Sequence, residues 1–337
     1  MSQFAATLGL WQPEAMRALL LLLVLIPINA SADWYREARD MMGTRVEVEL
    51  WADSAEQGER ALAAALAPME EVNRLMNPWD PASEISRVNR EGSRTPVAVS
   101  PPLFEVIERS LHYSRLSDGA FDISFASAGQ HYDYRTGTAP DGNVLEDAVA
   151  RIDYRSIRLD AAAGTIGFDR EGMKIDLGGI AKGYAVDRSI AALLELGILS
   201  AVVSAGGDSR ILGNLGDRPR TIGIRHPRRE GEFAVMIPLE DTAISTSGDY
   251  ERFFIDDAGR RVHHILDPGT GESSGAVQSA SVLAPRAIDS DALSTTAFVL
   301  GVERGLALIN RLPGVDAIII DADGLLHYSE GLLRETQ

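Results

Sequence analysis

The order of helical and strand-like segments along the chain is the feature that most limits the folds open to it. Residues 54–76 repeat apolar side chains at helical spacing behind a Ser54 cap, and residues 180–196 do the same before Gly197. Residues 44–52 alternate apolar and polar side chains, as strands do. These segments do not alternate as regularly as a doubly wound parallel sheet requires. The order favours an α+β fold, a single domain of two interlocked lobes with mixed or antiparallel sheets flanked by helices.

Turn residues divide the rest of the chain into shorter predicted elements, with no low-complexity linker and no repeat of fixed period. The shorter elements are a helix within 100–121 that is ended by Gly119, a hairpin over 156–177 with its turn at Gly164, two strands joined by two glycines within 199–215, a strand-rich stretch over 242–273, and two helices followed by a buried strand over 289–324. The second strand of the predicted hairpin runs up to Leu177, directly before two glycines.

The balance of charge excludes several classes of partner. The chain has 49 acidic and 32 basic residues, which gives a net charge of −17. Nucleic acids and anionic membrane surfaces repel such a protein, so neither is expected as a partner. A phosphate-ester ligand would need a cation between itself and the protein. The chain has no cysteine, which excludes disulfides, zinc–thiolate sites and cysteine nucleophiles.

The N-terminal region is typical of a secretory signal peptide. Arg17 supplies the positive end, residues 18–28 form an apolar stretch too short to span a bilayer comfortably, and Ala30 to Ala32 have the small-x-small pattern of a cleavage site. The sequence therefore predicts a cleaved extension and signal peptide over residues 1–32 and a mature domain over residues 33–337. No stable membrane span is expected after cleavage. The alternative is an uncleaved signal that holds the protein to the membrane.

The stretch DLGGIAKG, residues 176–183, combines an acid, bare backbone and a lysine at the start of a predicted helix. It matches neither the Walker phosphate loop nor the G-x-G-x-x-G dinucleotide turn. Gly178 and Gly179 would let a ligand approach the main chain, while free amides at the helix start and Lys182 favour an anion. The alternative is a purely structural corner between a strand and a helix.

Asp291 and Thr295 lie four residues apart in a predicted helix and therefore share one face of it. A carboxylate and a hydroxyl are hard oxygen ligands, which suit Mg²⁺ or Ca²⁺ better than zinc. Asp289, one turn earlier, could assist or could simply cap the helix. The alternative is an acid favoured by the helix dipole, with a threonine that bonds back to its own helix.

Two adjacent histidines, His263 and His264, precede a probable turn, and one of the two must face inward if this stretch is a strand. Histidine is the usual proton carrier near neutral pH, although polar decoration of a strand is an equally good explanation. Phe121 and Asp122 taken alone predict only a loop that returns to the core. The hydroxyl cluster at residues 245–247 taken alone predicts only a turn.

Eight segments, taken in order, resemble one family, the FAD:protein FMN transferases, also called the ApbE family. Each segment is weak alone, but eight in the same order are specific. They are MGTRVEVEL, WDPASEISRVN, GAFDIS, DLGGIAKGYAVD, SAGGDSRILG, STSGDYERFF, HILDPGTG and DALSTTAFVLG, and they run from about residue 42 to residue 301.

The resemblance implies an exported or membrane-tethered α+β enzyme that uses Mg²⁺. Such an enzyme cleaves the pyrophosphate of FAD, its substrate, and attaches FMN through a phosphoester bond to a Thr or Ser of an acceptor protein, releasing AMP. By matching position, the resemblance places flavin contacts at Met42, Trp79, Ala120, Phe121, Asp122, Asp176, Lys182 and Ile265, and it places the metal on the main-chain carbonyl of Gly179 and the side chains of Asp291 and Thr295.

These implied contacts suggest a role for the glycines and the charged residues around them. Gly178 and Gly179 would bring the main chain close to the pyrophosphate, and Lys182 would balance charge. Asp176 or His264 would accept the proton of the incoming hydroxyl. Trp79 and Phe121 would serve as apolar platforms for aromatic rings.

The chain departs from the family pattern at three places. Trp79 stands where a tyrosine is common, Ser294 stands where some members have another acidic metal ligand, and the lipid-bearing cysteine of many relatives is missing. The last departure favours a soluble periplasmic protein over a lipid-anchored one. The alternatives to FMN transfer are a periplasmic FAD pyrophosphatase that uses water as the nucleophile and a non-enzymatic flavin carrier.

Overall fold

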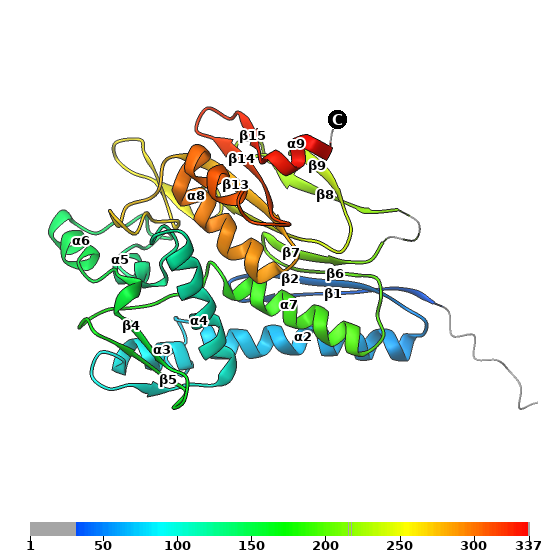
Figure 1. Cartoon of the computed structure of the whole chain (residues 1–337), viewed down its shortest axis with the longest axis horizontal. Helices are drawn as coiled ribbons and strands as arrows, with labels where there is room; N and C mark the ends of the chain where they lie inside the picture. The colour runs from blue at the N-terminus through cyan, green and yellow to red at the C-terminus, as the bar shows by residue number, and fades with distance from the viewer. Residues whose placement is uncertain (1–31, 215, 217, 336–337) are drawn as a thin grey trace, which may run out of the picture.

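An eight-stranded antiparallel sheet forms the centre of the computed structural model, which describes residues 32–214, 216 and 218–335 (Figure 1). The strand order is β1-β2-β6-β7-β10-β13-β14-β15. The predicted extension and signal peptide, residues 1–32, lies outside the described residues except for Ala32. The bounds are β1 Asp33–Met41, β2 Thr44–Ala52, β6 Ala201–Ala205, β7 Asp208–Leu212, β10 Ala243–Gly248, β13 Val277–Ala284, β14 Asp316–Asp321 and β15 Leu326–Tyr328.

Three long helices cover one face of this sheet, and Figure 1 shows them in front of the strands. They are α2 (Ala55–Met76), α7 (Ala181–Glu195) and α8 (Ala287–Ile309). Helix α2 packs on β1 and β2, α7 packs on β6 and β7, and α8 packs on β10, β13 and β14. Along β2 and β6 every second side chain enters a common core with the helices, whereas β13 is buried at every position.

A two-stranded ribbon and a short helix cover the opposite face. They are β8 (Arg220–Arg225) with β9 (Phe233–Leu239), and α9 (Glu330–Glu335). Ile244 and its neighbours on this side form a second apolar cluster, whereas Ala243, one residue earlier on β10, belongs to the main core. Because adjacent strand residues point to opposite faces, the central sheet is buried on both sides.

A smaller part of the molecule lies to the left in Figure 1, beyond the ends of α7 and α8. It brings residues 117–125 and 173–180 together, because the N–H of Asp176 donates to the carbonyl of Ile123 (2.9 Å). Its elements are α3 Glu84–Glu91, α4 Pro101–Leu116, η1 Ile123–Phe125, α5 Ala126–Gly129, α6 Gly142–Val149, η2 Tyr154–Ser156 and the strands β3 Val97–Ala98, β4 Ile157–Asp160 and β5 Thr165–Phe168; the remaining hairpin is β11 Phe253–Ile255 with β12 Arg261–His263.

Most of the predicted elements are confirmed, as is the α+β class, with antiparallel pairing between the described strands. The predicted strand at 44–52 is β2, and Ser54 caps α2 by accepting the N–H of Gln57. Helix α7 ends just before Gly197, which has a φ of +75°. A two-glycine turn joins β6 to β7, and Gly301, with a φ of +77°, divides α8 into the two predicted helical segments.

Two boundaries predicted from the sequence are wrong. Helix α4 stops at Leu116 because Asp118 and Gly119 adopt left-handed φ values of +50° and +86°. Residues 173–177 form no strand. The side-chain amide of Asn89 instead bonds both main-chain groups of Ile175, at 2.8 and 2.9 Å. A side chain so distant in sequence leaves no local signal at Ile175.

Helices α7 and α8 cross in very close contact. The N–H of Gly183 donates to Asp291 Oδ2 (2.9 Å), and a Cβ on Gly183 would lie 2.1 Å from the carbonyl oxygen of Ala287. The buried carboxylate of Asp187 caps α8 by accepting the N–H groups of Ala287 and Ile288, at 2.9 and 3.0 Å. Only a glycine permits this approach, so the crossing sets where the α8 side chains lie along α7.

Helix α8 is the one helix among residues 32–214, 216 and 218–335 that is long and apolar enough to cross a membrane, with a mean hydropathy of 1.4. It lies in the centre of the molecule against β10 and β13, and 56% of its most apolar window is buried there. Its apolar surface is therefore accounted for by packing on the sheet.

We predict that Gly183→Ala destabilises the protein by roughly 3 kcal/mol, because the added methyl group must push α7 away from the main chain of α8. Urea unfolding measures the change. Gly142→Ala is the matched control, since a Cβ at that helical glycine has nothing within 4 Å. Equal stability of the two variants would show that the crossing is not tight in solution.

Candidate functional site

The glycine corner, residues 176–183, turns the chain into α7. Asp176 Oδ1 accepts the N–H of Gly178 (2.6 Å), and Lys182 Nζ donates to the carbonyl oxygen of Gly178 (2.6 Å). These two bonds close the turn from both sides, and α7 begins at Ala181. Gly178 itself is exposed, so the main chain of the corner is open to a ligand.

Helix α8 brings two of its polar side chains to this corner. A Cβ on Gly179 would lie 3.2 Å from Thr295 Oγ1 and 3.3 Å from the ring of Phe121, so both side chains lie against Gly179. Ser247 on β10 reaches the same point, with its Oγ 3.1 Å from Thr295 Oγ1 and 2.8 Å from Ser294 Oγ. The structure thus brings together Gly179 and Thr295, two of the three positions predicted to hold a metal.

The third predicted metal position, Asp291, belongs to a buried charge cluster beside the corner. Lys182 Nζ lies 3.5 Å from Asp291 Oδ1 and 3.1 Å from Asp208 Oδ2, and both carboxylates are buried. Burial alone would lower the pKa of Lys182, but the charges of the two carboxylates outweigh it and raise that pKa above its ordinary value. Lys182 is therefore a fixed cation between two acids.

Burial, together with the charge of Asp208, raises the pKa of Asp291, even though Lys182 and the N–H of Gly183 stabilise the carboxylate. One lysine facing two buried carboxylates leaves the cluster with more negative than positive charge. Asp208 was not among the predicted site residues. The signal available for it was a single acid that follows two glycines at the start of an apolar strand, which by itself is typical of a turn.

The donor set at the corner fits a hard divalent cation. A main-chain carbonyl, a carboxylate and a hydroxyl are the oxygen ligands that Mg²⁺ takes, and Lys182 is the one cation paired with the two buried carboxylates among the described ion pairs. The described part of the chain holds no group of three or more His, Cys, Asp or Glu side chains placed to bind a metal. A cation here would therefore rely on uncharged oxygens as well as on Asp291.

Asp289 faces away from this site. Its Oδ1 accepts hydrogen bonds from Arg109 Nη2 (2.8 Å) and from the hydroxyl of Tyr113 (2.5 Å) and so joins α8 to α4. Of the two roles considered for Asp289, assisting the metal or capping the helix, capping is wrong because Asp187 caps α8, and the side chain of Asp289 is engaged by Arg109 and Tyr113 instead.

The two adjacent histidines have different surroundings, since His263 is the last residue of β12 and His264 lies in the bend that follows. His263 Nδ1 accepts the N–H of Ile265 (3.3 Å), so its Nε2 carries the proton and donates to the carbonyl of Ser274 (2.8 Å). His264 instead lies edge-on to Tyr134, with ring centroids 6.5 Å apart. Burial and then the charge of Arg252 lower the pKa of His264 to about 3, so its ring is neutral.

The surroundings of the glycine corner also shift the pKa of Asp176, the other candidate base. Burial raises the pKa of its carboxyl, while the N–H of Gly178 and the charge of Arg252 oppose that rise. Arg252 thus acts on Asp176 and on His264, and its Nη2 also donates to the carbonyl of Gly43 (3.4 Å). It links the predicted base residues to the turn that contains Met42.

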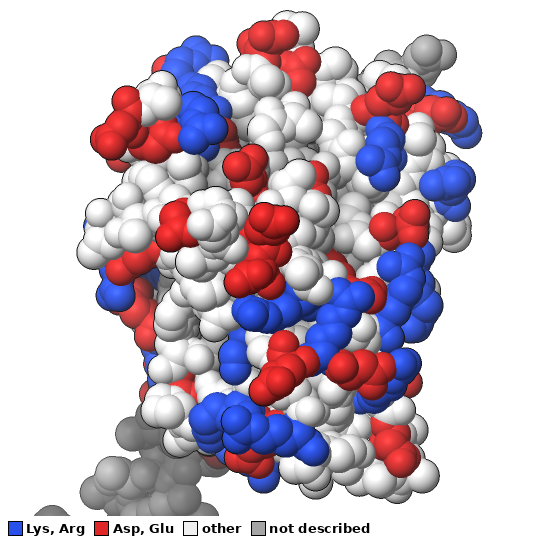
Figure 2. All heavy atoms as spheres, turned by 90° about the vertical axis from the view of Figure 1, so that its left-hand side faces the viewer, with Lys and Arg blue, Asp and Glu red and all other residues white. Residues whose placement is uncertain are grey.

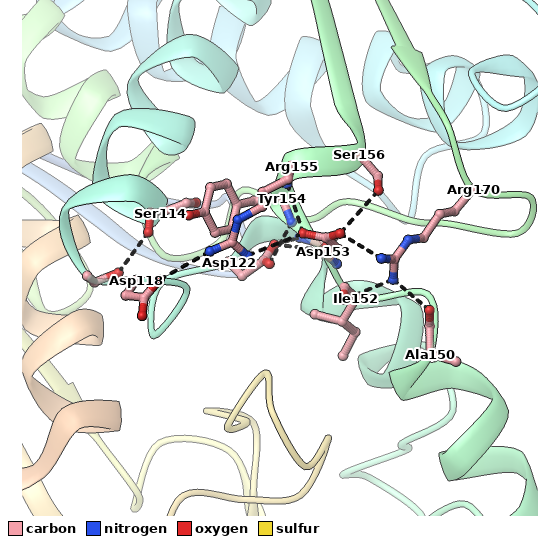
Figure 3. A network of polar contacts seen from close by, with 12 residues as sticks. Ser114, Asp118, Asp122, Ala150, Ile152, Asp153, Tyr154, Arg155, Ser156 and Arg170 are labelled. Atoms are coloured by element: carbon pink, nitrogen blue, oxygen red, sulfur yellow. Dashed lines mark hydrogen bonds and ion pairs between the residues drawn. The ribbon is translucent and has the colours of Figure 1, made fainter.

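The predicted flavin contacts on residues 120–122 lie in a segment fixed by polar contacts (Figure 3). Asp122 Oδ1 accepts from Ser124, and its Oδ2 accepts the N–H of Tyr154 (2.8 Å). Figure 3 shows Asp153 continuing this network to Arg170. Both carboxylate oxygens of Asp122 already accept hydrogen bonds within the protein. The network therefore holds Phe121 against Gly179 and leaves the carboxylate little capacity to bind a ligand.

The other three predicted flavin contacts, Met42, Ile265 and Trp79, lie on other segments of the chain. Met42, at a φ of +56°, forms the β1–β2 turn, and its N–H donates to Asn73 Oδ1 (3.1 Å). Ile265 is buried directly after His264. The side chain of Trp79 is 78% exposed, so an aromatic platform there would be open to solvent.

The whole fold matches solved flavin-transferase structures. A structure described as the ApbE protein from Thermotoga maritima is 31% identical, covers 90% of this chain and 99% of its own, and superposes with a TM-score of 0.81. The flavin transferase ApbE from Vibrio cholerae is 26% identical over the same shares, with a TM-score of 0.80. The protein is thus of the flavin-transferase class in architecture.

Sequence relatives point to the same family. A protein from Treponema pallidum, named FAD:protein FMN transferase, is 33% identical over 324 residues, which are 89% of this chain and 88% of the relative. One from Klebsiella pneumoniae with the same name is 30% identical over 242 residues, 71% of this chain and 75% of the relative. The model of the ApbE family matches residues 42–319, and the chain belongs to that family.

We predict that Lys182→Met lowers the free energy of unfolding by roughly 3 kcal/mol or more, because Asp208 and Asp291 would remain buried without their cation. The loss should be larger at pH 8 than at pH 6. A carboxyl whose folded pKa is raised stabilises the folded state only while it is protonated, so its ionisation at higher pH destabilises the variant.

Urea unfolding at the two pH values measures this effect. Arg334→Met is the control, because Arg334 forms an exposed pair with Glu330 (2.7 Å). If Lys182→Met lowers the free energy of unfolding equally at both pH values, then Asp208 and Asp291 do not repel each other in the variant as proposed.

Proposed function

We propose that this chain transfers FMN from FAD to a Thr or Ser hydroxyl of an acceptor protein, with Mg²⁺, and releases AMP. The observation that carries the proposal is the contact of Thr295 with Gly179, together with the bond from the Gly183 N–H to Asp291, in a member of the ApbE family. FAD is the substrate, consistent with the names of the relatives.

The reaction exchanges one phosphorus–oxygen bond for another. The acceptor hydroxyl oxygen forms a bond to the phosphorus of the FMN half, and the bond from that phosphorus to the bridging oxygen breaks. AMP leaves with the bridging oxygen, and a base on the protein takes the hydroxyl proton. The result is a phosphoester between FMN and the acceptor side chain.

The residues of the glycine corner would bind and orient the pyrophosphate. The exposed Gly178 lets the phosphates approach the main chain, and Lys182 and Arg252 supply positive charge. Phe121 lies beside Gly179 and offers an apolar ring to the flavin. Asp176 or His264 would accept the proton, Asp176 as a carboxylate made more basic by burial and His264 as a neutral ring.

The carbonyl of Gly179 and the side chains of Asp291 and Thr295 would hold the metal. When bound, Mg²⁺ would neutralise the phosphate oxygens and stabilise the negative charge on the departing AMP. Such a cation would also reduce the electrostatic repulsion expected between a pyrophosphate and a chain with a net charge of −17. Figure 2 shows Lys and Arg interspersed with Asp and Glu over the face that it draws, without a broad positive patch that could replace the cation.

The protein would act in the periplasm, exported by the predicted signal over residues 1–32, with an uncleaved membrane-held form as the alternative. This location matches the absence of cysteines, since an oxidising compartment then carries no risk of wrong disulfides.

We predict that incubation with FAD, Mg²⁺ and a candidate acceptor domain leaves fluorescent flavin on the acceptor band after denaturation, and that mass spectrometry finds FMN on a Thr or Ser. Asp291→Asn should reduce the transfer rate at least roughly 100-fold, because it removes the charged metal ligand. Asp289→Asn is the matched control, since it is on the same helix but binds Arg109 and Tyr113.

Two other outcomes of this experiment would contradict FMN transfer. Free FMN and AMP with an unlabelled acceptor would identify a pyrophosphatase. FAD that stays bound after chelation and yields no AMP over hours when Mg²⁺ is present would identify a flavin carrier. Equal loss of activity in the two Asp→Asn variants would show instead that the metal site is elsewhere.

We predict that Mg²⁺ binds more tightly as pH rises through the raised pKa of Asp291, because the metal requires the ionised carboxylate and competes with a proton for it. Calorimetric titration with Mg²⁺ at pH 6, 7 and 8 measures the affinity. Asp291→Asn should bind weakly at every pH. An affinity of the unmodified chain that does not change with pH would exclude Asp291 as a ligand.

A further inference from the structure

A cavity of about 180 Å³ lies beside β12, the strand whose last residue is His263. His263 lines the cavity, whereas His264, the first residue after the strand, lies edge-on to Tyr134. Residues 273–275, which follow the turn after Ile265, form another wall. The cavity therefore shares its backbone with the candidate active site but is separate from the glycine corner.

Gln278 in this cavity has a buried acceptor that no protein group uses. Its Nε2 donates to the carbonyl of Ala322 (2.8 Å), which identifies Oε1 as the free carbonyl oxygen, and in the described structure that buried atom has no hydrogen-bond partner. The whole residue is only 8% exposed. The β13–β14 register shifts between Val277 and Ser279, so Gln278 is the extra residue of a bulge, a device that re-aims a side chain.

Arg261, a second residue of the lining, has a buried donor that lacks an acceptor. Its Nη1 is buried and, among the residues described, has no acceptor, while its guanidinium stacks on Phe253 at 3.7 Å from the ring centroid. Leaving a buried donor or acceptor without a hydrogen-bond partner costs free energy. A ligand that accepts from Arg261 Nη1 and donates to Gln278 Oε1 is therefore favoured.

The other charges of the cavity largely cancel. Arg228 forms a two-point pair with Asp249 at 2.7 and 2.6 Å, so neither is free to bind a second ion strongly. Arg261 Nε lies 3.8 Å from the same carboxylate. The free groups are thus one donor and one acceptor, which suits a ligand with both an N–H and a carbonyl better than an ionised phosphate ester, which has no hydrogen to donate to Gln278 Oε1.

We propose that this cavity binds a main-chain amide of the acceptor polypeptide. A peptide group supplies an N–H for Gln278 Oε1 and a carbonyl for Arg261 Nη1, and it is uncharged. The inference rests on the proposed function, which requires a polypeptide to approach the His264 side. An extended chain advances ~3.3 Å per residue, so a few residues suffice to join an amide beside His263 to a hydroxyl near His264, the next residue of this chain.

The test uses the full chain labelled with ¹⁵N and a blocked peptide, N-acetyl-Gly-Thr-Gly N-methylamide. The side-chain amide signal of Gln278 is assigned by its disappearance in Gln278→Leu. We expect this signal to shift saturably as the peptide is added. An analogue with sarcosine in place of each glycine lacks two of the N–H donors and should bind roughly 3- to 10-fold more weakly.

Variants and a competing ligand make the test specific. Gln278→Leu and Arg261→Lys should each weaken peptide binding roughly 3- to 10-fold, followed at other shifted signals, with thermal melting to confirm that both variants fold. Gln57→Leu is the matched control, because the Gln57 amide also donates to a main-chain carbonyl, that of Leu196 (3.4 Å), on another part of the surface. Equal weakening in the control would overturn the proposal.

Three further results would overturn it. The first is no shift of the Gln278 signal at any peptide concentration. The second is a shift by inorganic phosphate that displaces the peptide, which would make the cavity an anion site. The third is displacement by FAD, which would make it part of the dinucleotide site.

The peptide titration needs neither FAD turnover nor an identified acceptor, so its failure is distinguishable from failure of FMN transfer. If transfer is observed, the same variants should raise the KM for the acceptor and leave the KM for FAD unchanged. An unchanged acceptor KM in both variants would count against the cavity and leave the transferase assignment intact.

Discussion

The close crossing of α7 and α8 at Gly183 is the contact on which the rest of the site depends. The missing side chain lets the Gly183 N–H reach Asp291 Oδ2 at 2.9 Å, and Asp187 then caps α8 one turn further along α7. With α8 fixed in this way, Thr295 lies against Gly179. A hydrogen bond from bare backbone and a cap between two helices thus align residues more than 100 positions apart in sequence.

The crossing also determines the electrostatics. Lys182 follows the glycine corner and lies between Asp208 and Asp291, which come from a strand and from the other helix. In a buried environment these charges interact far more strongly than the many exposed ones that make up the net charge of −17. The cluster has one cation for two acids and would attract a second cation, and burial together with the charge of Asp208 raises the pKa of Asp291.

Local patterns predicted well wherever a local rule decides the structure. Strand β2 and helix α2 follow from periodicity and a serine cap, and the glycines after α7 and between β6 and β7 mark real turns. The same rules failed at residues 173–177, because Asn89 supplies the hydrogen bonds that a neighbouring strand would otherwise supply. They also did not identify Asp208 or Ser247, whose significance comes only from their neighbours in space.

The sequence by itself determined the α+β class, most element boundaries, the family, and a set of residue types suited to a hard cation and a pyrophosphate. Only the tertiary structure decided which of those residues meet. It separated Asp289, bonded to Arg109, from Asp291, and it gave His263 and His264 different neighbours, the carbonyl of Ser274 and the ring of Tyr134. The reason is physical: period and capping act within a few residues, whereas burial, charge coupling and close helix contact depend on groups that only the folded chain brings together.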